Sequence, residues 1–145
     1  MAQEHGQRST VRSFGALLAG FFAVVILSLG TDFALVAVHV FPPLGGSMAD
    51  RLFAVATAYR VIYGVLGGYI TARLAPNRPM LHSLLGGAVG LVINIVVTIA
   101  TWHQTPALGP HWYPLALIVI TLPCSWLGGI FGSRHGSVST PRQGR

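Results

Sequence analysis

The sequence predicts an all-α fold, a bundle of four transmembrane helices. Hydrophobic residues make up 52% of the 145-residue chain and charged residues only 8%, whereas soluble domains carry about 25% charged residues. The apolar residues gather in four long stretches, separated by short segments rich in proline and glycine. Each stretch can cross a hydrocarbon core of about 30 Å at a helical rise of about 1.5 Å per residue. A lipid bilayer is therefore the first partner that we expect.

The first two spans form a predicted hairpin. We place the first span at residues 13–41, after a polar segment, residues 1–12, that we expect to be a cytoplasmic tail. This apolar run exceeds the core of a signal peptide, about 7–15 residues, so we expect it to be retained. The second span covers residues 50–75, and Ser47 with Asp50 three residues later resembles a capping box at its start.

A second predicted hairpin follows, with spans at residues 80–102 and 112–132. The segment between these two spans has no formal charge and is bordered by aromatic residues of the kind that favour a membrane interface. The tail at residues 133–145 is basic and rich in glycine, serine and proline. We expect this tail to be disordered and cytoplasmic, because it cannot bury enough apolar surface to fold.

The arginines predict the orientation of the spans. The chain has no lysine, and its net charge is +6. On one side of the predicted membrane only Arg51 is found, whereas the other side carries Arg8, Arg12, Arg73, Arg78, Arg134, Arg142 and Arg145. Short basic segments stay in the cytoplasm. Both termini are therefore predicted to be cytoplasmic.

Glycines recur at helical spacing on three of the predicted spans. Small residues let membrane helices approach closely, so we predict helix-packing faces that contain Gly64, Gly67, Gly68, Gly86, Gly90, Gly128 and Gly129. The second and fourth spans also share Leu-Gly-Gly, followed by arginine at the same offset. This echo suggests a tandem repeat of two hairpins. A common need for small residues and a basic end would give the same echo, so the duplication stays open.

Each predicted span also places a polar residue at a comparable depth. Asp32 and Arg60 lie roughly 15 Å from the ends of the first two spans, and Asn94 lies roughly 12 Å from the end of the third. Thr121 reaches the matching level of the fourth span. An ionisable side chain inside a span rarely faces lipid and needs a partner. We therefore predict a buried polar layer of Asp32, Arg60, Asn94 and Thr121, with an ion pair between the first two.

This layer is compatible with two functions. As a structural device it would fix the register of the helices. The protein would then be a small structural or accessory membrane protein, whose glycine-rich faces associate with a second copy or with a larger membrane-protein partner. As a site, the layer would form the solute, ion or proton pathway of a small transporter or channel subunit.

Other classes of function find little support. The sequence lacks the motifs of zinc proteases, serine hydrolases and phosphate-binding loops, so we expect neither an enzyme nor a cofactor. His39, His103 and His111 fall near the predicted outer surface, but their spacing matches no known ligand pattern. We therefore predict no metal site. The arginines form no basic stripe, which argues against nucleic acid as a partner.

Several short segments resemble a known group of proteins. They are Val40-Phe41-Pro42-Pro43, Tyr59-Arg60, Gly67-Gly68-Tyr69, Ala72-Arg73-Leu74-Ala75-Pro76, Arg78-Pro79-Met80, His82 and Trp112-Tyr113-Pro114. Over most of its length the chain is similar to small, uncharacterised four-span membrane proteins of bacteria. The resemblance implies a multi-span membrane protein and brings no activity with it.

Overall fold

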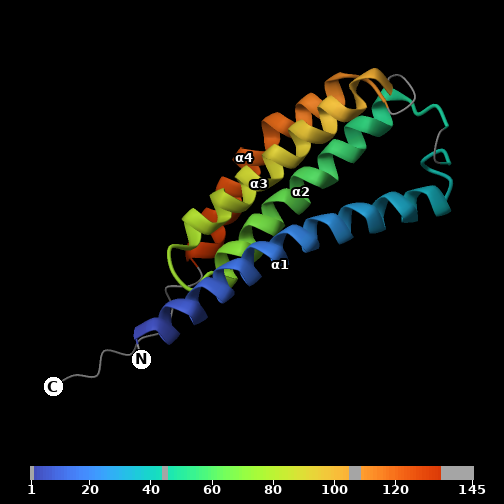
Figure 1. Ribbon diagram of the computed structural model, residues 1–145. Coiled ribbons are helices and arrows are strands. Elements are labelled where there is room, and N and C mark those ends of the chain that lie inside the picture. Colours follow the sequence, from blue (N-terminus) through green and yellow to red (C-terminus); the bar gives the residue numbers. More distant parts are fainter. Residues whose placement is uncertain (1, 44–45, 105–108, 135–145) are drawn as a thin grey trace.

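A computed structural model describes residues 2–43, 46–104 and 109–134 (Figure 1). These residues form four long helices and one short 3-10 turn, with no strand in the described part of the chain. The elements are α1 (Ala2–Ala37), α2 (Asp50–Leu74), α3 (Pro79–Thr101), η1 (Trp102–Gln104) and α4 (Trp112–Arg134). All four α-helices contain a stretch that is long and apolar enough to cross a membrane. The described residues thereby confirm the predicted all-α fold with four helices long and apolar enough to span a membrane.

The first helix departs from its predicted bounds at both ends. It begins at Ala2, so most of the predicted polar tail is helical in its backbone. It ends at Ala37, before the predicted boundary at residue 41, because His39 adopts a left-handed conformation with φ of 59°. The amides of His39 and Val40 donate to the carbonyls of Val36 and Leu35. These two bonds form a Schellman motif, which closes a helix without proline.

The other bounds differ from the predicted ones by two residues at most, and one predicted cap is wrong. The residue that caps the start of α2 is Ala49, which makes no side-chain capping bond, so Ser47 and Asp50 do not form a capping box. The last helix continues to Arg134, two residues beyond the predicted end. The rest of the predicted basic tail, residues 135–145, lies outside the described residues.

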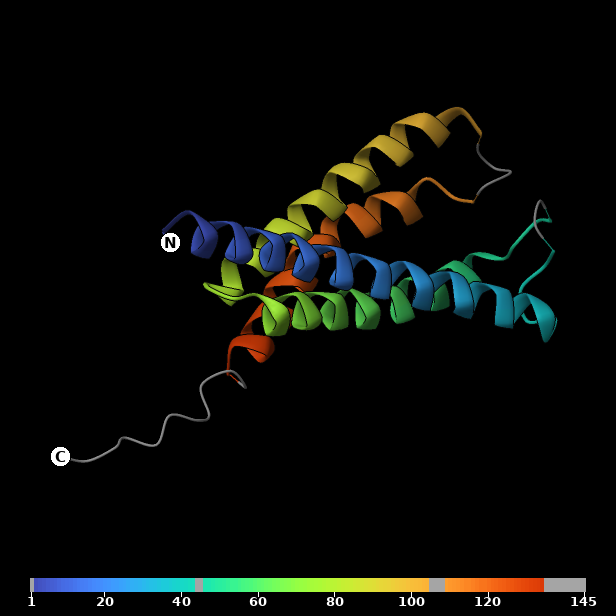
Figure 2. The same cartoon turned by 60° about the horizontal axis from the view of Figure 1, so that its bottom comes forward.

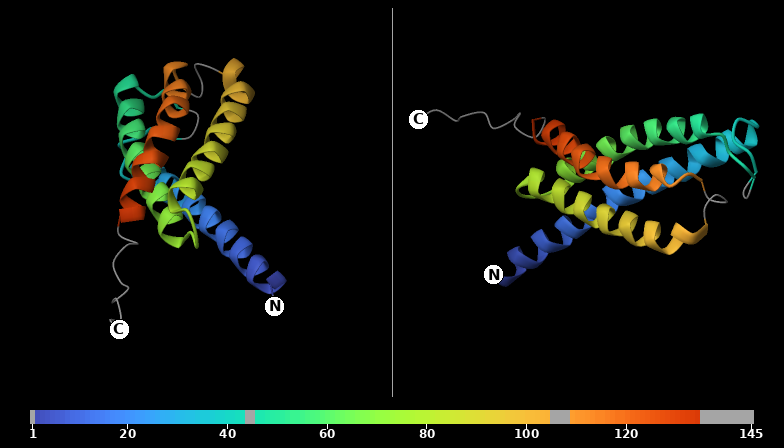
Figure 3. Two further views of the ribbon diagram at one scale, coloured as in Figure 1. Left: turned by 90° about the vertical axis from the view of Figure 1, so that its left-hand side faces the viewer. Right: turned by 90° about the horizontal axis from the view of Figure 1, so that it is seen from above.

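The four helices lie with their long axes roughly side by side (Figures 1 and 2). α2 packs against both α1 and α4, and α3 packs mainly against α4. Within the described residues, α1 makes no contact with α4. We call the end where α1 and α3 begin the termini end, and the opposite end the loop end. α1 and α3 approach each other near the termini end and diverge toward the loop end (Figures 2 and 3).

The distribution of side chains is inverted relative to a soluble protein. Large apolar residues point outward, and Ile26, Ile99 and Val119 are 66%, 70% and 71% exposed. Most of the buried residues on α2, α3 and α4 are instead small: glycine, alanine, serine, threonine and cysteine. Helices in a bilayer pack through small residues, because the surrounding lipid is as apolar as leucine. The surface and the core thus both suit a membrane.

Candidate functional site

A seam of glycines on α2 and α4 packs these two helices against each other and against α1 and α3 near the termini end. We call Gly67, Gly68, Gly128, Gly129 and Gly132 the glycine seam. A Cβ atom on Gly128 would lie 2.2 Å from the carbonyl oxygen of Val65 and 2.6 Å from the amide nitrogen of Tyr69. Such distances leave no room for a methyl group, so the two backbones are in direct contact here.

The predicted glycines outside the seam pack less tightly. A Cβ atom on Gly64 would lie 3.1 Å from Cys124, one on Gly86 would lie 3.4 Å from Leu17, and one on Gly90 would lie 3.5 Å from Thr121. All seven predicted glycines therefore face other helices of the same chain. The four that belong to the seam are buried there, so they are not available to a partner in this conformation.

Asp32 and Arg60 meet between α1 and α2 near the loop end. The Arg60 Nη2 atom donates to Asp32 Oδ2 at 2.6 Å, and the Tyr59 hydroxyl donates to the other carboxylate oxygen. The guanidinium carbon of Arg60 lies 5.5 Å from the ring centre of Tyr59 and 5.6 Å from that of Tyr113, at cation–π distance. The two side chains are 28% and 24% exposed, so the pair lies at the edge of the bundle and is not fully buried by the protein.

Asn94 and Thr121 form a second polar pair, between α3 and α4. The Asn94 amide donates to the Thr121 hydroxyl at 3.0 Å, and that hydroxyl donates in turn to the carbonyl of Leu117 at 2.5 Å. The structure records no hydrogen bond between Asn94 and Arg60 among the described residues. The four residues of the predicted layer are thus arranged as two separate pairs, one on each side of the bundle.

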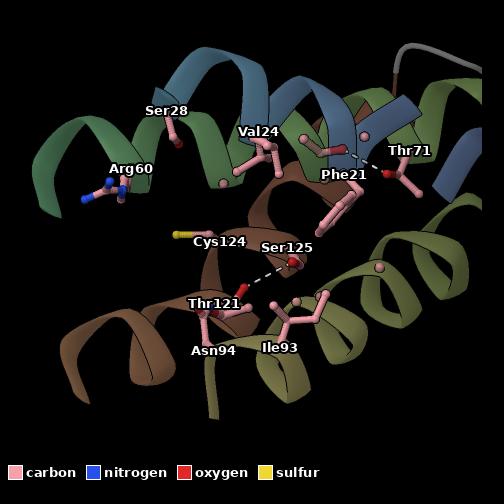
Figure 4. Close-up of a pocket in the computed structure, with 18 of the residues that line it drawn as sticks. Phe21, Val24, Ser28, Arg60, Thr71, Ile93, Asn94, Thr121, Cys124 and Ser125 are labelled. Carbon is pink, nitrogen blue, oxygen red and sulfur yellow. Dashed lines mark hydrogen bonds between the residues drawn. The ribbon is translucent and has the colours of Figure 1, made fainter. Parts of the chain in front are cut away.

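A cavity of about 360 Å³ lies between these two pairs. α1 and α3 form its opposite walls, while α2 and α4 contribute the rest (Figure 4). The divergence of α1 from α3 creates it, because α1 has no contact with α4 that would close the space. Every one of the four helices contributes at least one polar side chain to the lining: Ser28, Arg60, Thr71, Ser83, Asn94, Thr121 and Ser125.

The polar groups of the lining are unevenly distributed. Ser28, Arg60, Asn94, Thr121 and Cys124 lie toward one side of the cavity in Figure 4. Val24, Phe21 and Thr71 lie farther toward the other side. Gly67 is close to Val24, and Gly86 is close to Leu17 and Thr71. We call the first group the polar end and the second the apolar end.

Sequence reasoning missed two members of the polar end, Ser28 and Cys124. Ser28 lies four residues before Asp32, and Cys124 lies three residues after Thr121. Residues three or four apart share one face of a helix. The helical neighbours of the predicted layer could therefore have indicated both residues.

The structure does not gather the three histidines near the loop end into one group of potential ligands. His39 adopts the left-handed turn after α1, and the ring of His111 lies 4.4 Å from that of Trp102. No group of three or more potential metal ligands occurs among residues 2–43, 46–104 and 109–134.

No family model matches the chain, and comparisons with curated proteins and with solved structures found no significant match.

Proposed function

We propose that this chain is a small multi-pass protein of a bacterial inner membrane that binds a small molecule in its central cavity. It would act as a small transporter or as a subunit of one. The cavity is the observation that carries the proposal. It has about the size of known ligand sites, which span roughly 300–1,000 Å³, and its mostly apolar lining carries a few convergent polar groups.

The arginines support an orientation with both termini in the cytoplasm. Of the described arginines outside the interior of the spans, Arg12, Arg73, Arg78 and Arg134 belong to the termini end and Arg51 to the loop end, while Arg60 lies within its span. Basic residues mark the cytoplasmic side of membrane proteins. The polar end of the cavity would then lie in the outer half of the membrane, and the glycine seam would lie in the inner half.

A structural or accessory role is the second candidate. It is favoured by the ion pair, because Asp32 receives donors from both Tyr59 and Arg60 within the chain. Ion pairs of this kind can fix register without forming a site. The glycine seam gives this role less support, since its residues are occupied by contacts inside the bundle.

Labelling of an engineered cysteine separates the two candidates. Val24 lies in the cavity, so we would place a cysteine there as Val24→Cys, with Cys124→Ala removing the native thiol. In native membranes N-ethylmaleimide should label this cysteine. Filling the cavity with Gly90→Leu should block the labelling, because only Thr121 lies near a side chain at residue 90.

Gly30→Leu provides the matched control. Gly30 lies on α1, the helix that also carries Val24. A Cβ atom at residue 30 would meet no other heavy atom within 4 Å. The control should leave labelling of Val24→Cys unchanged. Labelling that is equally fast with Gly90→Leu and with Gly30→Leu would contradict the cavity site and favour the structural role.

A further inference from the structure

The polar end of the cavity offers more hydrogen-bond donors than the protein uses. The Arg60 side chain donates one of its five N–H groups to Asp32, and its guanidinium also interacts with Tyr59 and with the ring of Tyr113. Several of its N–H donors are left without a recorded acceptor among the described residues. The hydroxyl of Ser28 has no recorded partner in the described part of the chain, and Figure 4 shows it directed toward the cavity. A donor left without an acceptor in a membrane interior costs free energy. The polar end therefore favours a ligand that supplies acceptors.

The charge of the polar end limits the kind of hydrogen-bond acceptor that a ligand can bring there. Arg60 and the thiol of Cys124 are the ionisable groups among the described lining residues, and Asp32 neutralises Arg60 from outside the lining. An anionic ligand would bring an unbalanced charge into a low-dielectric space, and a cationic one would meet the donors of Arg60. A neutral acceptor, such as an ester or ketone carbonyl, satisfies the donors without either cost.

The apolar end defines the rest of the ligand. Leu17, Phe21 and Val24 form one wall there, and the hydroxyls of Thr71 and Ser125 already donate to carbonyls of their own helices. This end accordingly offers apolar contact and few free polar groups. The apolar end therefore suits the hydrocarbon part of a ligand.

The open side of the cavity indicates where the ligand comes from. Leu17 closes on Gly86 near the termini end, whereas α1 and α3 are apart toward the loop end. The residues beside this opening, Leu29 and Ile93, are 51% and 39% exposed. In a membrane these side chains would face lipid, so the opening would lead into the bilayer.

We propose that the cavity takes up a neutral amphipathic molecule from the bilayer, with its hydrocarbon body between α1 and α3 and its carbonyl oxygen at Arg60 and Ser28. This inference rests on the proposed function and specifies its ligand class. It excludes a strongly hydrated ion as the main cargo.

Protection of the cysteine at residue 24 tests this ligand class. Membranes containing Val24→Cys, Cys124→Ala would be incubated with methyl laurate, laurate or dodecylamine before N-ethylmaleimide is added. These probes share one hydrocarbon body and differ in the charge of the head group. Methyl laurate should protect best. Stronger protection by laurate or by dodecylamine would overturn the neutral class, and protection by none of them would overturn uptake from the bilayer.

A second variant tests the head group's position without disturbing the ion pair. Ser28→Ala removes one donor, and the concentration of methyl laurate needed for half-protection should rise roughly fivefold, as expected for one lost hydrogen bond. An unchanged concentration would overturn the placement of the carbonyl oxygen.

The same assay separates failure of this inference from failure of the proposed function. If Gly90→Leu blocks labelling but none of the three probes protects the cysteine, the cavity remains a site. Only this inference about its ligand is then rejected. Labelling that Gly90→Leu does not block would reject both.

Discussion

The two ends of this bundle use the same four helices in opposite ways. At the termini end, glycines bring α2 and α4 into backbone contact, and a Cβ atom on Gly132 would lie 2.5 Å from that of Ala72. Toward the loop end, long polar and aromatic side chains hold the helices, with Arg60 near Tyr59 and Tyr113. Small residues let the backbones of α2 and α4 touch at the termini end, whereas α1 and α3 diverge toward the loop end (Figure 2). The cavity lies between α1 and α3 and reaches Gly67 and Gly68 of the seam. The difference explains why the cavity opens toward one end.

The largest expected effect comes from placing a methyl group in the glycine seam. Gly128→Ala should lower the free energy of unfolding by about 3 kcal/mol, because the carbonyl of Val65 and the amide of Tyr69 are backbone atoms that cannot move aside. Unfolding in detergent measures this change. Gly30→Ala is the control and should not lower stability, since its methyl group meets open space and alanine favours a helix more than glycine does. Equal losses would show that the seam is not the tight end of the bundle.

Breaking the ion pair should give a smaller loss of stability. The loss from changing either residue should depend on whether the other residue of the pair is still present. Asp32→Asn leaves Arg60 without its carboxylate and should destabilise by about 2 kcal/mol, somewhat less than the cost of a lone charge at the centre of a span, because the pair is partly exposed. Arg60→Ala should then cost much less in the Asp32→Asn background than in the parent protein. Unfolding of the two single variants and the double variant gives the coupling, which we expect at about 1 kcal/mol. If the two losses of stability simply add, Asp32 and Arg60 do not stabilise the loop end as a coupled pair.

The smallest effect concerns a single hydrogen bond at the termini end. Ser83 is 1% exposed, and its hydroxyl donates to the carbonyl of Ser125 at 2.6 Å. Ser83→Ala should cost about 1 kcal/mol in the same unfolding assay. Thr101→Val is the control, because the exposed Thr101 hydroxyl bonds only within its own helix, to Val97. If the two variants behave alike, this bond adds nothing to the contact between α3 and α4.

The sequence was sufficient for the four helices and for the meeting of Asp32 with Arg60. Long apolar runs identify spans by length alone, and the only acid within an apolar span has few partners to choose from. The end of α1 could not be anticipated, because a left-handed His39 has no strong signal in the sequence. The capping box failed for a similar reason, since the pattern at Ser47 does not fix the backbone before α2.

The cavity itself lies beyond what sequence reasoning reaches. Its existence depends on the angle between α1 and α3, which is set by how Gly86 approaches Leu17 and by the lack of contact between α1 and α4. The same divergence of α1 from α3 explains why the predicted polar layer is divided into two pairs. Asn94 lies on the α4 side of this opening and bonds to Thr121, while Arg60 remains with α1.

The comparison of the two ends is tested most directly by the reactivity of two cysteines. Val24→Cys probes the cavity, and Ala72→Cys probes the seam, where the native side chain is 3% exposed. Both would be made with Cys124→Ala and treated with N-ethylmaleimide in native membranes. We predict rapid labelling at residue 24 and almost none at residue 72. Equal rates at the two positions would contradict the account, because the bundle would then be sealed, or open, along its whole length.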